Sequence, residues 1–147
     1  MALLLACGPW KLGKMKPEEK MVEFQRFLDD NLEAVWRTRH RRNPNRLREY
    51  PYPLNLYFYW DNTIRFRANC RDIQCHDKGD WPQSMIPEKF RSDPDREAYI
   101  LGIFIDKLER VEDRDIKDFP KWKKPGHFDE GLQQLVKVQD IFVPVKE

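Results

Sequence analysis

Two runs of alternating side chains between residues 54 and 70 constrain the fold of this chain more than any other feature. The first run reads LNLYFYW, the second reads IRFRANC, and the residues DNT separate them. Because successive side chains of a strand point to opposite faces, each run predicts a strand, and together they predict a β-hairpin over about residues 54–70. One face of this hairpin is apolar and is expected to lie in the core. It consists of Leu54, Leu56, Phe58, Trp60, Ile64, Phe66, Ala68 and Cys70.

The opposite face of the hairpin carries tyrosines and arginines. A loop of odd length keeps the two apolar sides in register, whereas a two-residue turn would bring an arginine to the apolar side. We therefore expect an odd loop, with Tyr59 across from Arg65 and Tyr57 across from Arg67. Ring–guanidinium pairs of this kind contribute about 0.5–1 kcal/mol at an exposed site. We call these four residues the hairpin face and predict that it binds a partner.

Apolar residues at spacings of three and four predict two helices. The first is amphipathic and begins at Pro17, since proline is tolerated at the first helical position, and it is expected to run to about Arg39. Its apolar stripe contains Met21, Phe24, Leu28, Leu32 and Val35. The second helix is expected over about residues 94–111 and, as the most apolar helical run, at the centre of the core. Its apolar residues are Ile100, Leu101, Phe104, Ile105, Leu108 and Val111.

The length of 147 residues fits one domain, and the helices and hairpin together predict a single small α+β domain over residues 17–147. Within it we expect an irregular, proline-rich connector at about residues 72–92, a linker at about 118–127, and a C-terminal helix or edge strand. Residues 1–16 are interpreted as a flexible N-terminal segment. This segment contains lysines and no acidic residue, so a mitochondrial targeting segment is an alternative.

Arginine is concentrated between residues 37 and 48, where RTRHRRNPNRLR contains no acid. The six arginines of this stretch, which we call the arginine arm, are Arg37, Arg39, Arg41, Arg42, Arg46 and Arg48. Guanidinium groups bind phosphates in a bidentate manner and rings stack on bases, so the arm and the hairpin face are typical of RNA contact. The net charge of the whole chain is only +2, so any such contact would be local. The alternatives are contact with an acidic protein and ion pairing with the acids of residues 106–118.

Cys70, Cys75 and His76 form the one cluster of soft metal ligands in the sequence. A structural zinc site needs four ligands, usually as two close pairs, and no second pair is present. We therefore favour buried or incidental thiols and expect no cofactor, with zinc as the alternative. Together with nearby aspartates, this cluster gives a small metal-dependent module or hydrolase as the alternative function. A phosphate loop, a nucleophile elbow and an HExxH motif are all absent from the sequence, which disfavours an enzyme.

The number of cysteines also bears on the compartment. The chain has three, and an odd, sparse set favours a reducing intracellular compartment, the cytoplasm or nucleus. The apolar run MALLLAC is too short to span a bilayer, so no membrane span is expected. Residues 50–54, YPYPL, resemble the YPxxL motif with which viral and cellular proteins recruit an adaptor. This resemblance gives a viral or regulatory adaptor as a further alternative.

The combination of arm, hairpin face and long irregular connectors favours a function in binding. Segments with few apolar residues gain order from neighbours rather than from their own core. Our leading hypothesis is therefore a non-enzymatic interaction or structural subunit of a larger assembly. Its partners would be proteins and RNA, as in an organellar ribosome.

Overall fold

A meander of three antiparallel strands forms the centre of the fold. The computed structural model describes residues 2–39 and 43–116, together with the backbone of residues 133–135. The meander consists of β3 (Leu54–Trp60), β4 (Thr63–Cys75) and β5 (Leu101–Asp115). The other elements are β1 (Ala2–Ala6), α1 (Pro17–Asp30), β2 (Ala34–Thr38), α2 (Pro44–Arg48) and β6 (Gln133–Leu135). The predicted α+β class and the hairpin are confirmed.

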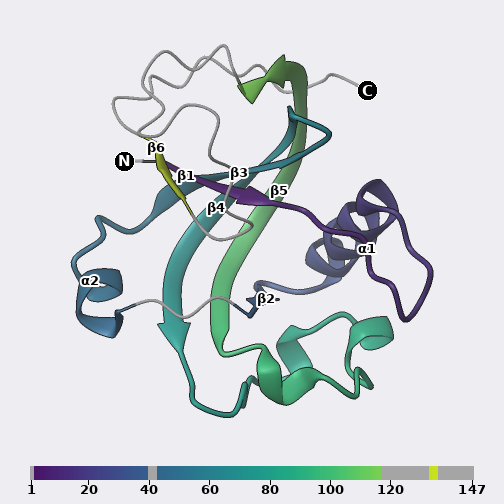
Figure 1. Cartoon of the computed structure of the whole chain (residues 1–147), viewed down its shortest axis with the longest axis vertical. Coiled ribbons are helices and arrows are strands. Elements are labelled where there is room, and N and C mark those ends of the chain that lie inside the picture. The colour runs from purple at the N-terminus through teal and green to yellow at the C-terminus, as the bar shows by residue number, and fades with distance from the viewer. Residues whose placement is uncertain (1, 40–42, 117–132, 136–147) are drawn as a thin grey trace.

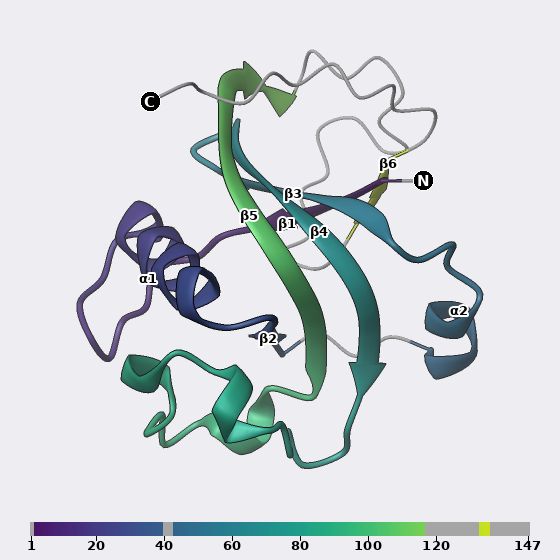
Figure 2. The ribbon, with the colours of Figure 1, turned by 180° about the vertical axis from the view of Figure 1, so that it is seen from behind.

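All six strands belong to one sheet, in the order β2-β5-β4-β3-β1-β6. Only β1 and β3 pair in parallel among these neighbours; the other pairs are antiparallel. Figure 1 shows β4 and β5 as two long, curved strands, with α1 and α2 on opposite sides of them, and the view from behind in Figure 2 agrees. Among the described residues, none of the helices combines the length and the apolar character needed to cross a membrane.

The hairpin uses a two-residue turn and a bulge instead of the odd loop that we expected. Asp61 and Asn62 have φ angles of 51° and 58°, which are typical of a tight hairpin turn, and Trp60 pairs with Thr63. The register then shifts between Phe58 and Tyr59, so that from Phe58 onward the pairing is the predicted one. The bulge leaves one residue of β4 unpaired. From Phe58 onward the apolar side chains of the two strands therefore pair with each other, although the turn has only two residues.

Residues 101–115 form the strand β5, so the predicted core helix over residues 94–111 is wrong. Register shifts in the pairing of β4 with β5 explain the misleading pattern. One shift leaves Asp106 unpaired between Ile105 and Lys107, which moves the alternation of side chains by one residue. As a result, the buried Ile105 and Leu108 are three residues apart, which imitates a helical spacing.

The first helix is shorter than predicted, because α1 ends at Asp30 and β2 begins at Ala34. Acidic residues occupy the last turn of α1, where the helix dipole disfavours them, and Asn31 is already extended. Leu32, which the helical stripe placed in the core, is 95% exposed. The start at Pro17 and the amphipathic character of α1 agree with the prediction.

The N-terminal residues belong to the sheet, so the flexible segment predicted for residues 1–16 is wrong for Ala2–Ala6. These residues form β1, which lies between β3 and β6 and is almost entirely buried. The run LLL shows no alternation of apolar and polar residues, because both faces of β1 are covered. β6 is a short edge strand within the region where we expected a C-terminal helix or edge strand. The predicted linker at residues 118–127 lies outside the described residues.

The connector between β4 and β5 begins later than predicted, because β4 continues to Cys75. It contains three single 3₁₀ turns, Gln83–Met85, Glu88–Phe90 and Arg96–Ala98. Trp81, Ile86 and Phe90 are buried and attach it to the core. The indole N–H of Trp81 also donates to the carbonyl oxygen of Tyr99 at 2.6 Å. Apolar anchors of this kind hold an otherwise irregular segment in place.

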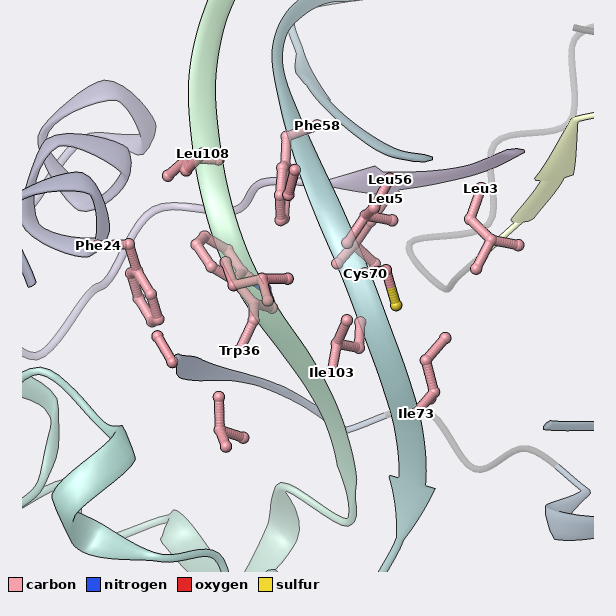
Figure 3. Close-up of a cluster of buried hydrophobic side chains, with 14 of the residues drawn as sticks. Leu3, Leu5, Phe24, Trp36, Leu56, Phe58, Cys70, Ile73, Ile103 and Leu108 are labelled. Atoms are coloured by element: carbon pink, nitrogen blue, oxygen red, sulfur yellow. The ribbon is translucent and has the colours of Figure 1, made fainter. Parts of the chain in front are cut away.

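The buried side chains of the described residues form two clusters. The larger one lies on the side of the sheet that α1 covers, and Figure 3 shows Phe24 of α1, Trp36 of β2 and Phe58 of β3 within it. The ring centroids of Phe24 and Trp36 are 4.5 Å apart, and those of Trp36 and Phe58 are 4.6 Å apart. The smaller cluster lies on the opposite face of the sheet. Its buried members are Ala2, Leu4, Tyr57, Tyr59, Ile64, Val111 and Ile116.

Candidate cationic binding surface and cleft

The tyrosines of the hairpin face are core residues, which corrects the prediction that they bind a partner. Tyr57 is fully buried and Tyr59 is 6% exposed, and both belong to the smaller cluster. Tyr57 does pair with Arg67 as expected. Tyr59 pairs with Ile64 rather than with Arg65, because the bulge displaces Arg65 from the register. The sequence pattern could not reveal that a second apolar cluster covers this side of the hairpin.

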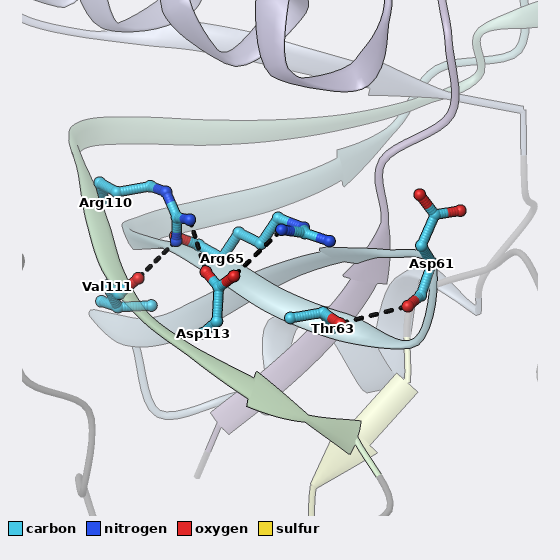
Figure 4. Close-up of polar contacts among 6 residues, drawn as sticks. All are labelled: Asp61, Thr63, Arg65, Arg110, Val111 and Asp113. Carbon is cyan, nitrogen blue, oxygen red and sulfur yellow. Dashed lines mark hydrogen bonds and ion pairs between the residues drawn. The ribbon is translucent and has the colours of Figure 1, made fainter.

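The arginines of the hairpin contact acids of β5. The Arg65 guanidinium forms an ion pair with Asp113 at 3.1 Å, and Arg110 reaches the same carboxylate (Figure 4). Arg67 donates to Glu109, with Nε 2.8 Å from the carboxylate oxygen. Arg65 also lies over the ring of Trp60, 5.1 Å from its centroid.

Arg71 continues this series, because its Nη1 lies 3.0 Å from a carboxylate oxygen of Asp106. Both residues are the unpaired members of register shifts in neighbouring strands, so the two bulges place them side by side. Arg65, Arg67 and Arg71 are therefore neutralised within the sheet. We expected acids of this region as one partner of the arginine arm. Three of them, Asp106, Glu109 and Asp113, form ion pairs with arginines of β4 instead.

Two arginines of the arm lie at the end of β2 and contact the connector. Arg37 donates from Nη2 to the carbonyl oxygen of Phe90 at 2.7 Å, and its guanidinium lies 5.0 Å from the ring centroid of Tyr99. Arg39 lies over the same ring and forms an ion pair with Asp95 at 3.1 Å. Its side chain is nevertheless 54% exposed. Arg37 is thus a structural residue, whereas Arg39 is accessible.

The remaining described arginines of the arm, Arg46 and Arg48, are exposed on α2. The side chain of Asn43 caps this helix by accepting from the backbone N–H of Asn45 at 3.0 Å. Arg48 donates to Asn45 and to the carbonyl oxygen of Pro44. Within the described part of the chain, neither guanidinium has a carboxylate partner. Arg41 and Arg42 lie outside the described residues.

The predicted metal ligands do not come together as a site. Cys70 is buried in the larger cluster, where its thiol donates to the carbonyl oxygen of Asp72. The ring of His76 stacks on Trp81 with centroids 4.1 Å apart, and its two nitrogens lie 3.0 Å from the carbonyl oxygen of Asp80 and 3.1 Å from Gln74 Oε1. Among the residues described, no group of three or more His, Cys, Asp or Glu side chains is placed to hold a metal ion.

The YPxxL-like stretch is not an extended, accessible peptide. Its last residue, Leu54, is 5% exposed at the start of β3. The hydroxyl of Tyr52 donates to the carbonyl oxygen of Leu47 at 2.7 Å, which attaches the stretch to α2. The stretch therefore contributes to packing, and this geometry gives no support to an adaptor motif.

A cleft of about 950 Å³ lies where the ends of β1 and β2, the hairpin turn and the connector meet. Its walls combine rings and charges. They include Trp10, Lys20, Trp36, Arg37, Arg39, Trp60, Asp61, Asp93, Asp95 and Tyr99. Its volume is at the upper end of the range typical of small-molecule sites. The structure thus brings Arg37 and Arg39 to one cleft and leaves Arg46 and Arg48 on the surface of α2.

Charged groups in the cleft are perturbed by burial. Burial raises the pKa of the Cys7 thiol to about 12 and lowers the pKa of Lys20, each partly opposed by the attraction between the two groups. Burial also acts to raise the pKa of Asp93, but the backbone N–H of Asp95, the Tyr99 hydroxyl and the Trp10 indole outweigh it. The pKa of Asp93 is therefore lowered, and the residue is a carboxylate at neutral pH.

Sequence reasoning missed Lys20, Asp93 and Tyr99, because they come from segments far apart in the chain. One signal was available for Lys20. It precedes Phe24 by four residues, so both share a helix face that is turned to the core. Nothing in the sequence around Asp93 or Tyr99 indicates that these two residues share a cleft with Lys20.

Comparisons of the chain with models of protein families, with curated proteins and with solved structures found no match. The geometry of the arm and of the cleft therefore provides the evidence on function.

Proposed function

We propose that the protein is a non-enzymatic interaction subunit of a larger assembly and that it binds RNA through the exposed arginines of the arm. The observation that carries this proposal is the division among the arginines. Those of β4 and β5 meet carboxylates, whereas Arg46 and Arg48 on α2 have none among the described residues. Exposed cations whose charge no carboxylate neutralises are able to contact phosphates.

The surroundings of α2 favour RNA over an acidic protein. Tyr50 and Tyr52 follow the helix directly, and both are half-buried with ring centroids 6.2 Å apart. Rings beside arginines suit single-stranded RNA, whose bases stack on aromatic side chains while guanidinium groups contact the backbone. Arg39 extends the cationic character of the arm toward the cleft. Aromatic rings give no comparable advantage to a carboxylate-rich protein surface.

The proposal is tested by titrating the protein into a short labelled single-stranded RNA and measuring fluorescence anisotropy. We expect Arg46→Gln with Arg48→Gln to weaken binding roughly tenfold or more at low salt, because two charge-assisted phosphate contacts are lost. The thermal midpoint should hardly change, since both side chains are exposed. A matched control removes two exposed cations elsewhere, Arg26→Gln on α1 with Lys107→Gln on β5, and should bind nearly as the wild type does.

Two results would contradict the proposal. The wild type could fail to bind RNA at low salt, or the two double variants could lose affinity equally. The second result would mean that binding follows the total charge rather than the α2 surface.

A further inference from the structure

Lys20 is a cation without a polar partner inside the cleft. It projects from the first turn of α1, and its ammonium lies 4.5 Å from the ring centroid of Trp36. Within the described residues this ammonium forms no hydrogen bond and no ion pair; the backbone N–H of Lys20 donates to the carbonyl oxygen of Lys16. The ring face supplies only a weak attraction, on the order of 1 kcal/mol, and satisfies none of the ammonium N–H groups as an oxygen would.

Asp93, the carboxylate whose charge acts to raise the pKa of Lys20, does not fill this role. Asp93 is buried, and its oxygens accept from the backbone N–H of Asp95 at 2.9 Å, from the Tyr99 hydroxyl at 2.9 Å and from the Trp10 indole at 3.4 Å. All three of these hydrogen-bond donors to Asp93 are neutral groups. No ion pair joins it to Lys20.

The other groups that face Lys20 do not neutralise it either. Cys7, at the end of β1, is an un-ionised thiol at neutral pH, because burial raises its pKa to about 12. Arg37 of β2 is a second cation, and one of its nitrogens, Nη1, is buried without a hydrogen-bond partner in the described part of the chain. Burial is the largest cause that lowers the pKa of Lys20, and Arg37 adds to it. An anion beside the Lys20 ammonium would favour its charged form and so oppose both of these causes of the lowered pKa.

The cleft also offers an apolar wall next to this cation. Leu5, Pro9 and Leu12 line it together with the rings of Trp10 and Trp36. Small-molecule sites typically combine such apolar walls with a few polar groups that fix the orientation of the ligand. The cleft therefore matches a ligand with one anionic group and an apolar body.

We propose that the cleft binds a small organic anion, with its phosphate or carboxylate on the Lys20 ammonium and its apolar ring against the wall formed by Pro9, Trp10 and Leu12. This site is separate from the α2 surface and does not depend on RNA binding. Arg39, at the rim, would attract the anion without holding it.

The test uses phenyl phosphate and benzoate as probes, with inorganic phosphate and benzyl alcohol as the matching anion and ring alone. Binding is followed by isothermal titration and by tryptophan fluorescence, since Trp10 and Trp36 line the cleft. We expect at least one of the two aromatic anions to bind more tightly than both partial probes, and which of the two binds better identifies the head group.

Lys20→Met keeps a long side chain over Trp36 and removes the charge. It should weaken binding about tenfold, in line with the loss of one charge-assisted hydrogen bond. Lys78→Met removes an exposed lysine that does not line the cleft and should leave binding nearly unchanged. Unchanged affinity of Lys20→Met, or binding no tighter than that of benzyl alcohol, would overturn the proposal.

A second measurement uses the wild-type protein, so that it holds even if Lys20→Met does not fold. The pKa of Lys20 is measured by NMR from its side-chain carbons, with and without the better probe. An anion on the ammonium favours its charged form, so the pKa should rise on binding. A pKa that does not move in the presence of saturating probe would place the ligand elsewhere and contradict the assignment.

Discussion

Arginines that look alike in the sequence differ in what their guanidinium groups contact. Arg65, Arg67 and Arg71 of β4 reach carboxylates of β5, so these pairs connect the two strands. Arg46 and Arg48 reach only neutral acceptors or solvent. Net charge conceals this division, because it adds the acids that pair with the sheet arginines to the two arginines of α2, which have no carboxylate partner among the described residues.

Buried thiols should make the stability of the protein depend on alkaline pH. Burial raises the pKa of Cys70 from its ordinary value of 9.0 to about 12, and that of Cys7 likewise. The folded state therefore holds these protons more tightly than the unfolded state does. Their contribution to the free energy of unfolding is fully present below pH 9 and falls as the pH rises toward 12.

This dependence is measurable by urea unfolding at several pH values between 8 and 11. Above pH 9 each thiol should reduce the free energy of unfolding by about 1.4 kcal/mol per pH unit. Cys70→Ala and Cys7→Ala should each make the decline shallower, and the double variant more so. Lys20 acts in the opposite direction, because its pKa is lowered in the folded state. A decline of equal slope in the wild type and the double variant would refute this account of the two thiols.

Strands β3 and β4 were predictable because alternation over several residues has one simple physical cause. Strand β5 was not, because its bulge at Asp106 interrupts the alternation and creates a spacing of three between Ile105 and Leu108. Ile103 pairs with Ile73 and Ile105 pairs with Cys70, which are thirty or more residues earlier in the chain. A local pattern cannot report a partner at that distance.

The N-terminal strand was missed for a related reason. Leu3, Leu4 and Leu5 are all buried, since β1 lies inside the sheet and has core on both faces. A strand of this kind shows no alternation, and a short apolar run before lysines is equally compatible with a segment outside the fold. The position of β1 in the sheet depends on its parallel pairing with β3, in which Leu5 lies opposite Phe58.

A substitution in β1 tests this placement. Leu5→Ala removes a side chain that is 1% exposed, so it should lower the free energy of unfolding by about 2–5 kcal/mol. Leu32→Ala is the matched control, because Leu32 is 95% exposed and should change stability by less than about 0.5 kcal/mol. Equal, small effects in urea unfolding would mean that residues 2–6 are not part of the core.

The curvature of the sheet creates the cleft. β1 and β2 are four positions apart in the strand order, and yet Leu5 and Cys7 at the end of β1 line the same cleft as Trp36 and Arg37 of β2. The connector closes it with Asp93 and Tyr99. This arrangement depends on how far the strands bend, which composition and spacing do not encode. Arg37 and Arg39 were predicted as binding residues, but the cleft that they line was not predicted.

In the molecule as a whole, α2, which carries Arg46 and Arg48, lies on one side of β4 and β5, and α1, which carries Lys20, lies on the other (Figure 1). The arm therefore serves two places: Arg46 and Arg48 face outward on α2, while Arg37 and Arg39 border the cleft. Arg46 and Arg48 can be replaced without unfolding the protein, because both side chains are exposed.

The measurement that tests the RNA proposal most directly is the salt dependence of RNA affinity. The logarithm of the association constant should fall linearly with the logarithm of salt concentration, with a slope of about −0.7 for each phosphate contacted on a single strand. Replacing Arg46 and Arg48 by glutamine should make the slope shallower by about 1.4, and the control variant with Arg26 and Lys107 replaced should keep the wild-type slope. Equal slopes in all three proteins would contradict the assignment of RNA contact to α2.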